Sequence, residues 1–322
     1  HVAYVVGGCV RDSLLGKEPK DWDICTSATP DQIKEILSSY KILDTGLQHG
    51  TVTVVVEDGN YEVTTFRVDG KYSDGRHPDK VEFVSTLYDD LRRRDFTINA
   101  MAFNPTVGLI DYFGGERDLR DRVLSCVGKP QERFQEDALR ILRALRFASV
   151  YGFCIKDITS QAIHEHSNLL ENIATERINS ELCKLLLGDN ASSILLEYSD
   201  VISKIIPQFA PCIGFDQNNR FHQYTVYEHI VHAVENYPGQ DLVTKLTLLL
   251  HDIGKPQCYT EDEKGGHFHG HGVVSRDIAE RILTDLRFDN KTTRQVSELV
   301  LYHDSTIAPT EKNVKKWLNK IG

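Results

Sequence analysis

The sequence predicts an α+β head, built as a mixed sheet with helices, followed by an all-helical remainder. Short runs rich in β-branched residues at 51–57, 61–68 and 81–84 are separated by "DGN" and "DGKYSDGRHP", which are typical of turns. From "EDALRILRALRFASVYGF" onward, apolar residues recur at helical spacing and strand signals nearly vanish. The character of the chain therefore changes near residue 110.

Helices are also expected inside the head. One covers "VRDSLLG" (10–16) and a second covers "ATPDQIKEILSSY" (28–40), which begins with Thr29 and Pro30, a pair typical of helix starts. The segment "KDWDI" lies between them, and we expect a strand over residues 20–25.

The length of 322 residues exceeds the roughly 100 to 200 residues of one domain, so the chain predicts two or three domains. We expect a head over 1–110, a helical part over 111–185 and a second helical part over 186–322. No internal repeat or long linker marks these boundaries.

The charge balance argues against general polyanion binding. The formal net charge is −10, which still permits a local basic cleft on an acidic body. The seven cysteines form no Cys-x-x-Cys pair, and the sequence shows neither a signal peptide nor an apolar run of about 18 residues. We therefore expect reduced thiols in a cytoplasmic protein with no membrane partner, and the oligomeric state stays open.

The first chemical signal is the pair Asp21 and Asp23. On a strand, the period of two would turn both carboxylates to one face. Such a pair is costly to keep charged unless a divalent cation neutralises it, and Mg²⁺ is commonly bound by one or two carboxylates together with substrate phosphates. The preceding "GGCVRD" offers glycines for a close backbone approach to a triphosphate, and Arg11 as a charged phosphate donor. Together they indicate phosphoryl or nucleotidyl transfer, although an Asp-x-Asp pair alone is also a common accident of protein surfaces.

Several motifs in order resemble those of class II tRNA nucleotidyltransferases, the CCA-adding enzymes and their bacterial poly(A) polymerase relatives. They are "VGGCVRD", "DWDI", "YEVTTFR", "RRRDFTINAMAF", "DYFGG" and "EDALRILRALRF", and the resemblance covers about residues 2–185. It implies a head of the DNA polymerase beta nucleotidyltransferase type, followed by helical neck, body and tail domains. It also implies addition of CCA to the tRNA 3′ end from CTP and ATP, with release of pyrophosphate.

The resemblance assigns roles to residues of the head. Asp21 and Asp23 would hold two Mg²⁺ ions, one activating the tRNA 3′ hydroxyl and one bound to the triphosphate. Gly8 and Arg11 would contact the incoming nucleotide. Glu62 is a candidate third acid near the metals, or else an exposed strand carboxylate, and Arg94 could reach a phosphate or the ribose.

The segment "EDALRILRALRF" carries the polar residues Asp137, Arg140, Arg143 and Arg146, three apart along one expected helix. From the residues alone, a salt-bridged surface helix is the favoured explanation, because acid and base pairs at this spacing are frequent. The resemblance implies instead that Asp137 and Arg140 read the base of CTP or ATP through Watson-Crick-like hydrogen bonds, since a carboxylate accepts from an exocyclic amine and a guanidinium donates to ring acceptors. Arg143 and Arg146 would add contacts to the nucleotide or its phosphates.

The segment 67–83 resembles a flexible loop of CCA-adding and A-adding enzymes that CC-adding enzymes lack. Gly70 and Gly75 would permit its movement as the pocket changes from C-specific to A-specific. A mobile loop without a role is the alternative.

A second set of motifs lies downstream. His229, His251 with Asp252, His271 and His303 stand in the order of an HD phosphohydrolase domain, over about residues 222–310. Imidazole and carboxylate are both ligands of first-row divalent metals, so a second metal site is expected here. Whether such a domain hydrolyses phosphate esters or serves only as a helical body stays open, and His267 and His269 are loop histidines or further ligands.

Three functions follow from these motifs. The leading prediction is a CCA-adding tRNA nucleotidyltransferase that uses CTP and ATP. An A-adding enzyme or poly(A) polymerase is its neighbour, and a metal-dependent HD phosphohydrolase with a vestigial head is the alternative from another class.

Overall fold

The structure is a computed structural model that describes residues 1–69, 81–218, 223–263, 265–306 and 308–321. Among these residues, no helix has the length and apolar character needed to cross a bilayer.

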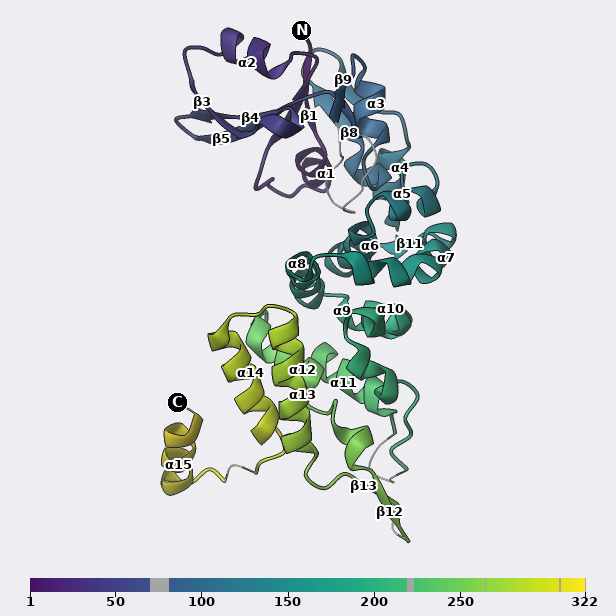
Figure 1. Ribbon diagram of the computed structural model, residues 1–322, viewed down its shortest axis with the longest axis vertical. Helices are drawn as coiled ribbons and strands as arrows, with labels where there is room; N and C mark the ends of the chain where they lie inside the picture. The colour runs from purple at the N-terminus through teal and green to yellow at the C-terminus, as the bar shows by residue number, and fades with distance from the viewer. Residues whose placement is uncertain (70–80, 219–222, 264, 307, 322) are drawn as a thin grey trace. The chain divides into compact units, whose positions relative to one another are not determined.

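The chain forms two compact units (Figure 1). The first contains His1–Ala144 and Phe153–Leu169, and the second contains Leu145–Gly152 and Leu170–Gly322. The division falls within one helix, and the three-part domain scheme drawn from the sequence stays a prediction.

The first unit is built on a seven-stranded sheet with the strand order β3-β4-β5-β2-β1-β8-β9. Its strands are β1 (Ala3–Val6), β2 (Asp23–Thr26), β3 (Lys41–Gly46), β4 (Thr51–Val56), β5 (Gly59–Thr65), β8 (Met101–Asn104) and β9 (Gly108–Asp111). Strands β2 and β5 run parallel, whereas the other neighbouring strands are antiparallel. This confirms the mixed sheet expected from the sequence.

Short helices and strand pairs complete the first unit. They are α1 (Gly8–Leu14), α2 (Pro30–Ile36), η1 (Leu47–His49), β6 (Arg67–Asp69), β7 (Val81–Phe83), α3 (Leu87–Arg92), η2 (Thr97–Asn99), α4 (Gly115–Arg120), β10 (Val123–Leu124), α5 (Pro130–Glu136), β11 (Cys154–Ile155) and α7 (Asp157–His166). Helix α2 begins as expected, because Thr29 and Gln32 satisfy each other's backbone N–H groups in a capping box. The predicted mobile loop, with Gly70 and Gly75, lies outside the described residues apart from its ends in β6 and β7.

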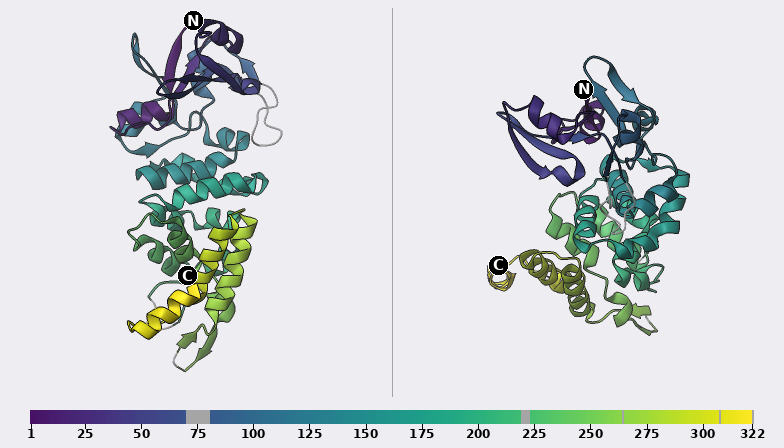
Figure 2. Two further views of the ribbon diagram at one scale, coloured as in Figure 1. Left: turned by 90° about the vertical axis from the view of Figure 1, so that its left-hand side faces the viewer. Right: turned by 45° about the horizontal axis from the view of Figure 1, so that its top comes forward.

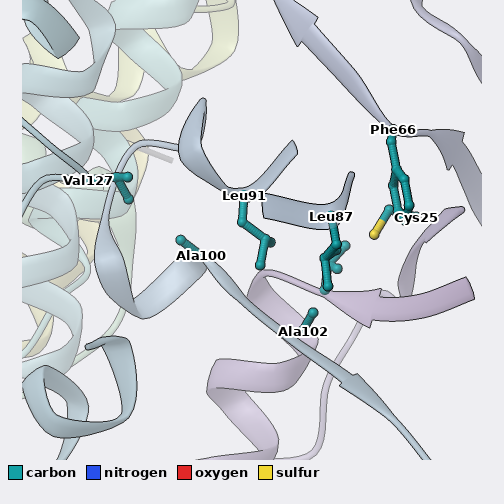
Figure 3. Close-up of a cluster of buried hydrophobic side chains, with 8 residues drawn as sticks. Cys25, Phe66, Leu87, Leu91, Ala100, Ala102 and Val127 are labelled. Atoms are coloured by element: carbon teal, nitrogen blue, oxygen red, sulfur yellow. The ribbon is translucent and has the colours of Figure 1, made fainter. Parts of the chain in front are cut away.

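Two apolar clusters hold the sheet to its helices. One packs Ile33 of α2 against Val52, Val54 and Val63 of strands β4 and β5. In the other, Leu87 and Leu91 of α3 face the segment that carries Ala100 and Ala102 (Figure 3). Its buried members are Val6, Cys25, Phe66, Leu87, Leu91, Ala100, Ala102 and Val127. Because α3 is fixed on the sheet in this way, the arginines that follow it have defined positions.

Strand β2 begins at Asp23, so the expectation of a strand over 20–25 is wrong for its first three residues. The neighbouring β1 pairs Val5 with Ile24 and then leaves the sheet at Gly7, whose φ of 76° turns the chain into α1. Asp21 therefore precedes the strand. The alternation of side chains along β2 determines the face only of Asp23, and it does not determine where Asp21 points.

Helix α6 (Leu139–Tyr151) begins later than expected. Asp137 is extended, with φ of −142° and ψ of 102°, and its Oδ1 accepts the backbone N–H of Leu139 at 3.0 Å. The expected placement of Asp137 and Arg140 on one helix is therefore wrong, because Asp137 lies in the break between α5 and α6. Arg140, Arg143 and Arg146 do follow one another at steps of three along α6.

The second unit is mainly helical. Besides the end of α6, it contains η3 (Ser167–Asn172, which begins in the first unit), α8 (Thr175–Leu186), α9 (Ala191–Glu197), α10 (Ser199–Ile205), η4 (Pro207–Cys212), α11 (Val226–Glu235), α12 (Leu242–Leu250), η5 (Lys255–Cys258), β12 (Thr260–Asp262), β13 (Gly265–His267), α13 (His271–Asp285), α14 (Asn290–Tyr302) and α15 (Glu311–Ile321). Helices α13 and α14 lie side by side, and the hairpin β12-β13 projects below them in the left view of Figure 2. Thr225 starts α11 with a second capping box, closed by Glu228.

Candidate active sites

The turn between β1 and α1 brings the backbone of the head against Arg94. A Cβ atom on Gly7 would lie 2.7 Å from Nη1 of Arg94, so the glycine provides both the left-handed turn and the space for this guanidinium. Nη2 of Arg94 lies 3.3 Å from Oδ2 of Asp90, which is fully buried and also pairs with Arg93 at 2.9 Å. Burial would raise the pKa of Asp90, but the two guanidinium groups hold that pKa below its usual value. The sequence motifs did not identify this carboxylate as the anchor of Arg94.

Asp21 and Asp23 are both exposed at the edge of this turn. Partial burial raises the pKa of Asp23, the guanidinium of Arg94 opposes that rise, and the carboxylate of Asp21 adds to it. The two acids and Arg94 are therefore near enough to influence one another. This electrostatic arrangement suits a divalent cation, because a cation removes the repulsion between the two carboxylates.

Glu62 stands beside Asp23 on the neighbouring parallel strand, because the register pairs these two residues directly. Glu62 is exposed. Three or more His, Cys, Asp or Glu side chains could hold a metal ion where their ligand atoms lie within 4.8 Å of one another. Among the described residues such sets occur in the helical unit, and Asp21, Asp23 and Glu62 do not form one. Glu62 adds negative charge near the pair without being one of three converged ligands.

Arg11 of α1 is buried and held from two sides. Its Nε and Nη2 donate to the carboxylate of Asp12 at 2.9 and 3.0 Å, and its Nη1 donates to Oδ1 of Asn99 at 2.6 Å. Gly8 begins the same helix, one turn before Arg11. The structure therefore joins "GGCVRD" to "RRRDFTINA", which are about ninety residues apart in the chain.

A buried carboxylate connects the head to α6. Asp95 accepts from Asn99 through Oδ1 at 3.1 Å, and from Nε and Nη2 of Arg143 through Oδ2 at 2.8 and 2.6 Å. Burial would raise the pKa of Asp95, but the charge of Arg143 and these hydrogen bonds hold that pKa well below its usual range. Arg143, which we expected to contact the nucleotide, is thus paired inside the protein.

The two residues expected to read the base have separate surroundings. Arg140 is buried, forms an ion pair with Glu136 at 2.8 Å, and donates to the backbone carbonyl of Arg93 at 3.0 Å. Asp137 caps the first turn of α6, as described above. Among the hydrogen bonds that the structure defines for the described residues, none joins the side chain of Asp137 to that of Arg140. In the second unit, Arg146 forms an ion pair with the buried Glu181 of α8 at 2.8 Å and stacks over Phe147.

The histidines of the helical unit converge on one buried carboxylate. Oδ2 of Asp252 lies 3.1 Å from Nε2 of both His229 and His251, while Oδ1 lies 3.2 Å from Nε2 of His271 and 3.3 Å from Nε2 of His303. They come from α11, from the end of α12, from the start of α13 and from the end of α14. Two sets of three ligands result, and both include Asp252. The sequence order thus predicted the correct neighbours in space.

The hydrogen bonds of these rings define their chemistry. Nδ1 of His251, His271 and His303 each lies 2.7 Å from a backbone carbonyl three residues earlier, and a carbonyl only accepts, so each Nδ1 carries the hydrogen. Neutral rings then direct the Nε2 lone pair toward Asp252, and the Nε2 atoms of His271 and His303 are only 3.1 Å apart. Such a group of lone pairs is stable only around cations, whether protons or metal ions.

Asp252 itself is prepared for a cation. Its Oδ1 is buried without a well-formed hydrogen bond, even though two imidazoles are near it, while Nζ of the buried Lys255 lies 2.8 Å from its Oδ2. Burial would raise the pKa of Asp252, but hydrogen bonds from the four imidazoles, in the form that carries a hydrogen on Nε2, hold that pKa far below the usual range. A cavity of about 470 Å³ opens on this group, and its wall includes His267, His269 and Asp304. The rings of His267 and His269 stack at 5.6 Å. The sequence reasoning missed Lys255, which the "HDIGK" motif contains.

Comparison with known proteins gives consistent results for the three parts of the chain. Residues 3–125 match the model of the poly A polymerase head domain, residues 152–213 match a probable RNA and SrmB-binding site of polymerase A, and residues 221–316 match the HD domain.

Curated relatives include two CCA-adding enzymes. The protein of Ligilactobacillus salivarius is 51% identical over 209 residues, which are 65% of this chain and 51% of that protein. The protein of Enterococcus faecalis is 53% identical over 188 residues, which are 58% of this chain and 46% of that protein. The chain spans about half the length of these curated relatives.

Solved structures extend the likeness over nearly the whole chain. The Bacillus stearothermophilus CCA-adding enzyme in complex with CTP has a TM-score of 0.69 and 32% identity, covering 98% of this chain and 69% of that chain. A tRNA nucleotidyltransferase complexed with a primer tRNA and an incoming ATP analog has a TM-score of 0.66 and 26% identity, covering 99% of this chain and 87% of that chain.

Proposed function

This chain belongs to the family of the CCA-adding tRNA nucleotidyltransferases, and on that premise we propose that it adds or restores the 3′-terminal CCA of tRNA from CTP and ATP. The observation that carries the proposal is the group formed by Asp21, Asp23 and Arg94 around the Gly7 turn. It combines two carboxylates for divalent cations with a guanidinium for a phosphate, which nucleotidyl transfer requires. The relatives solved with CTP and with a primer tRNA support the choice of substrates. We place the reaction in the cytoplasm, since all seven cysteines are free thiols.

Asp21 and Asp23 would hold the divalent ions, which we propose are Mg²⁺ because oxygen ligands and substrate phosphates suit that ion. When bound, two such ions would stabilise the attacking 3′ oxygen and the departing pyrophosphate. Arg94, fixed by Asp90, would bind a phosphate beside the Gly7 turn, and Arg11, next to Gly8, would hold the triphosphate. Glu62 would add to the negative field beside Asp23 without acting as a ligand of the same ion.

We propose that Asp137 and Arg140 select the base. The carboxylate of Asp137 can accept from the exocyclic amine of cytosine or adenine, and the guanidinium of Arg140 can donate to their ring acceptors. Uracil and guanine present a carbonyl in place of the amine and an N–H in place of the ring acceptor, so neither can satisfy both groups. Arg140 is paired with Glu136 and with backbone carbonyls in this structure, so base reading requires these bonds to exchange. Arg143 and Arg146 would support the helix through Asp95 and Glu181, and their contacts with the nucleotide stay a prediction.

The test uses the purified protein and tRNA that lacks its CCA end. We expect incorporation of labelled CTP alone up to two residues, and incorporation of AMP only after them. Addition of AMP alone to tRNA that already ends in CC, with no CMP incorporation into tRNA lacking CCA, would instead identify an A-adding enzyme. Repeated addition of AMP to any RNA would identify a poly(A) polymerase.

A second function is proposed for the HD centre, because Asp252 offers one carboxylate oxygen to each of two histidine pairs. These five side chains would hold first-row divalent ions, and imidazole ligands favour ions such as Fe²⁺, Ni²⁺ or Zn²⁺ over Mg²⁺. A bound ion there would act as a Lewis acid on a phosphate ester. Lys255 would keep Asp252 oriented, and His267 and His269 would line the entry to the centre.

Hydrolysis assays test this second function. Phosphomonoesters and 2′,3′-cyclic nucleotides are incubated with the protein after each metal is added to a metal-stripped sample. We expect hydrolysis that depends on the metal and is lost in Asp252→Asn. Hydrolysis that persists in Asp252→Asn would assign the activity to another site or to a contaminant.

A further inference from the structure

We propose that Asn99 is a positioning residue that orients Arg11 for the triphosphate and connects it, through Asp95, to Arg143 of α6. The inference rests on the proposed nucleotidyl transfer. It assigns a role to a side chain that touches neither the metal-binding acids nor the base-reading residues in the structure.

The hydrogen bonds have a direction that only certain side chains can satisfy. Nη1 of Arg11 donates to Oδ1 of Asn99 at 2.6 Å, and Nδ2 of Asn99 donates to Oδ1 of Asp95 at 3.1 Å. The middle residue must therefore accept from a cation with one end and donate to an anion with the other. A carboxylate at position 99 would repel Asp95, and an apolar side chain would serve neither neighbour.

The relay, defined as Arg11, Asn99, Asp95 and Arg143, is buried along most of its length. Arg11, Asn99 and Asp95 are 7%, 6% and 8% exposed, so water cannot easily replace a lost bond. Asn99 ends the 3₁₀ turn η2, whose first residue Thr97 donates to the buried Asp118 at 2.7 Å. The position of the amide is thus fixed by the backbone and not by the relay alone.

Arg11 depends on this amide for its orientation. Asp12 holds Nε and Nη2 of Arg11, but it follows Arg11 directly in α1 and moves with that helix. Asn99 holds Nη1 from a different element, and this bond ties the guanidinium to the segment that carries η2. Without it, the guanidinium loses a restraint from outside α1, and ligand binding would have to restore its orientation.

The far end of the relay gives the sharpest consequence. Arg143 lies on the base-reading helix and binds Asp95 through two nitrogens. Without Arg143, the Asp95 carboxylate would change its hydrogen bond with Asn99. Because the same amide accepts from Arg11, this change would shift the guanidinium of Arg11. The affinity for a ligand that has phosphates but no base should therefore depend on Arg143.

The experiment measures binding of inorganic tripolyphosphate, in Mg²⁺, by its displacement of labelled CTP. We expect Asn99→Leu, which keeps the number and branching of the side-chain heavy atoms and removes both bonds, to weaken tripolyphosphate binding roughly tenfold, the effect of one lost hydrogen bond to a charged group. Arg143→Met should weaken it roughly threefold, and the double variant should be no weaker than Asn99→Leu alone, because both changes break one relay. Asn99→Ser, whose hydroxyl both accepts and donates, should fall between the wild type and Asn99→Leu, and it serves if Asn99→Leu does not fold.

Two further readouts separate positioning from general damage. Steady-state kinetics of Asn99→Leu should show a raised KM for CTP and ATP by the same factor, with an unchanged ratio of CTP to UTP selection. Arg120→Met, which removes an exposed arginine with its own ion pair to Asp121, is the matched control and should bind tripolyphosphate as the wild type does.

The outcomes distinguish the relay from the function on which it rests. A wild-type protein that binds neither CTP nor tripolyphosphate would contradict the proposed function and the relay together. A wild-type protein that binds both, with Asn99→Leu equally tight or with effects of Asn99→Leu and Arg143→Met that multiply, would overturn the relay and leave nucleotidyl transfer standing.

Discussion

The two candidate sites of this chain use carboxylates in opposite ways. In the head, Asp21 and Asp23 are exposed and form no set of three converged ligands with Glu62 among the described residues. In the helical unit, the side chain of Asp252 is 3% exposed, and four imidazoles surround its two oxygens within 3.3 Å. One site is incomplete without its substrate, whereas the other has its ligands already assembled.

The difference follows from what each site must admit. Under the proposed function, the head must accept a polymer end and a triphosphate, so its metal ligands would lie at an open edge and the substrate phosphates would complete the coordination. In the proposed HD centre, the cost of desolvating the buried carboxylate is met when the protein folds, and the centre would bind cations before any substrate arrives. The comparison predicts that the two sites respond separately to substitution and to metal.

The largest effect is expected at the head. Replacing both Asp21 and Asp23 with Ala should reduce CMP and AMP incorporation by about three orders of magnitude or more, because the metal contribution to the transition state is several kcal/mol. The circular dichroism should not change, since both side chains are exposed and outside the apolar clusters. Incorporation near the wild-type rate would remove the metal-binding role of this pair.

The next effect separates the sites. His251→Ala combined with Asp252→Ala should abolish metal-stimulated hydrolysis and leave CCA addition within about twofold of wild type, as expected for sites that share no residues. Lys255 loses its carboxylate partner in this variant, so thermal unfolding is measured in parallel. Loss of transferase activity at an unchanged unfolding midpoint would show that the two sites are coupled.

Base selection should change by a smaller factor. Asp137→Ala should lower the preference for CTP over UTP roughly tenfold to a hundredfold, the value of one hydrogen bond to a charged group, and should affect triphosphate affinity less. The stability cost should be about 1 kcal/mol, that of a helix cap, because Asp137 caps α6 through the N–H of Leu139 while Arg140 pairs with Glu136. Glu136→Gln is the matched comparison, since it changes Arg140 and leaves the cap intact. An unchanged CTP to UTP ratio of kcat/KM in Asp137→Ala would contradict its role in base reading.

The smallest effect concerns pH and the buried Asp95. Its pKa is lowered in the folded protein, so the stability it contributes is fully present above the unfolded value of about 3.9 and is lost as the pH falls toward the lower folded value. Wild type should therefore exceed Asp95→Asn by about 2 kcal/mol at pH 6, with a difference that shrinks below about pH 4. Denaturant unfolding across this range checks the sign, and a difference that grows on acidification would contradict it.

Local sequence signals predicted much of the fold. Thr29 and Pro30 mark the start of α2 because a capping box needs only neighbouring residues, and the β-branched runs mark β4 and β5 because their alternation is visible in the chain. The helix containing Asp137 was placed too early, since apolar spacing continues through a break that depends on one backbone torsion. Periodicity reports which face is buried and does not report where the hydrogen-bond ladder is interrupted.

The sites were predicted less completely, for a physical reason. Motifs found the residue types that bind metals and phosphates, including all five members of the HD centre. They did not find the contact between Asn99 and Arg11 across 88 positions, or the pairing of Asp95 with Arg143 across 48. Such contacts are created by packing of distant elements, and no local spacing encodes them.

Counting bound Mn²⁺ ions per chain by equilibrium dialysis tests the contrast between the sites most directly. The measurement compares wild type, Asp252→Asn and the Asp21→Ala, Asp23→Ala variant, each with and without CTP. We predict two ions without CTP that are lost in Asp252→Asn, and further ions that appear only with CTP and only when Asp21 and Asp23 are present. Ions that bind at Asp21 and Asp23 without nucleotide, together with none that depend on Asp252, would contradict the account.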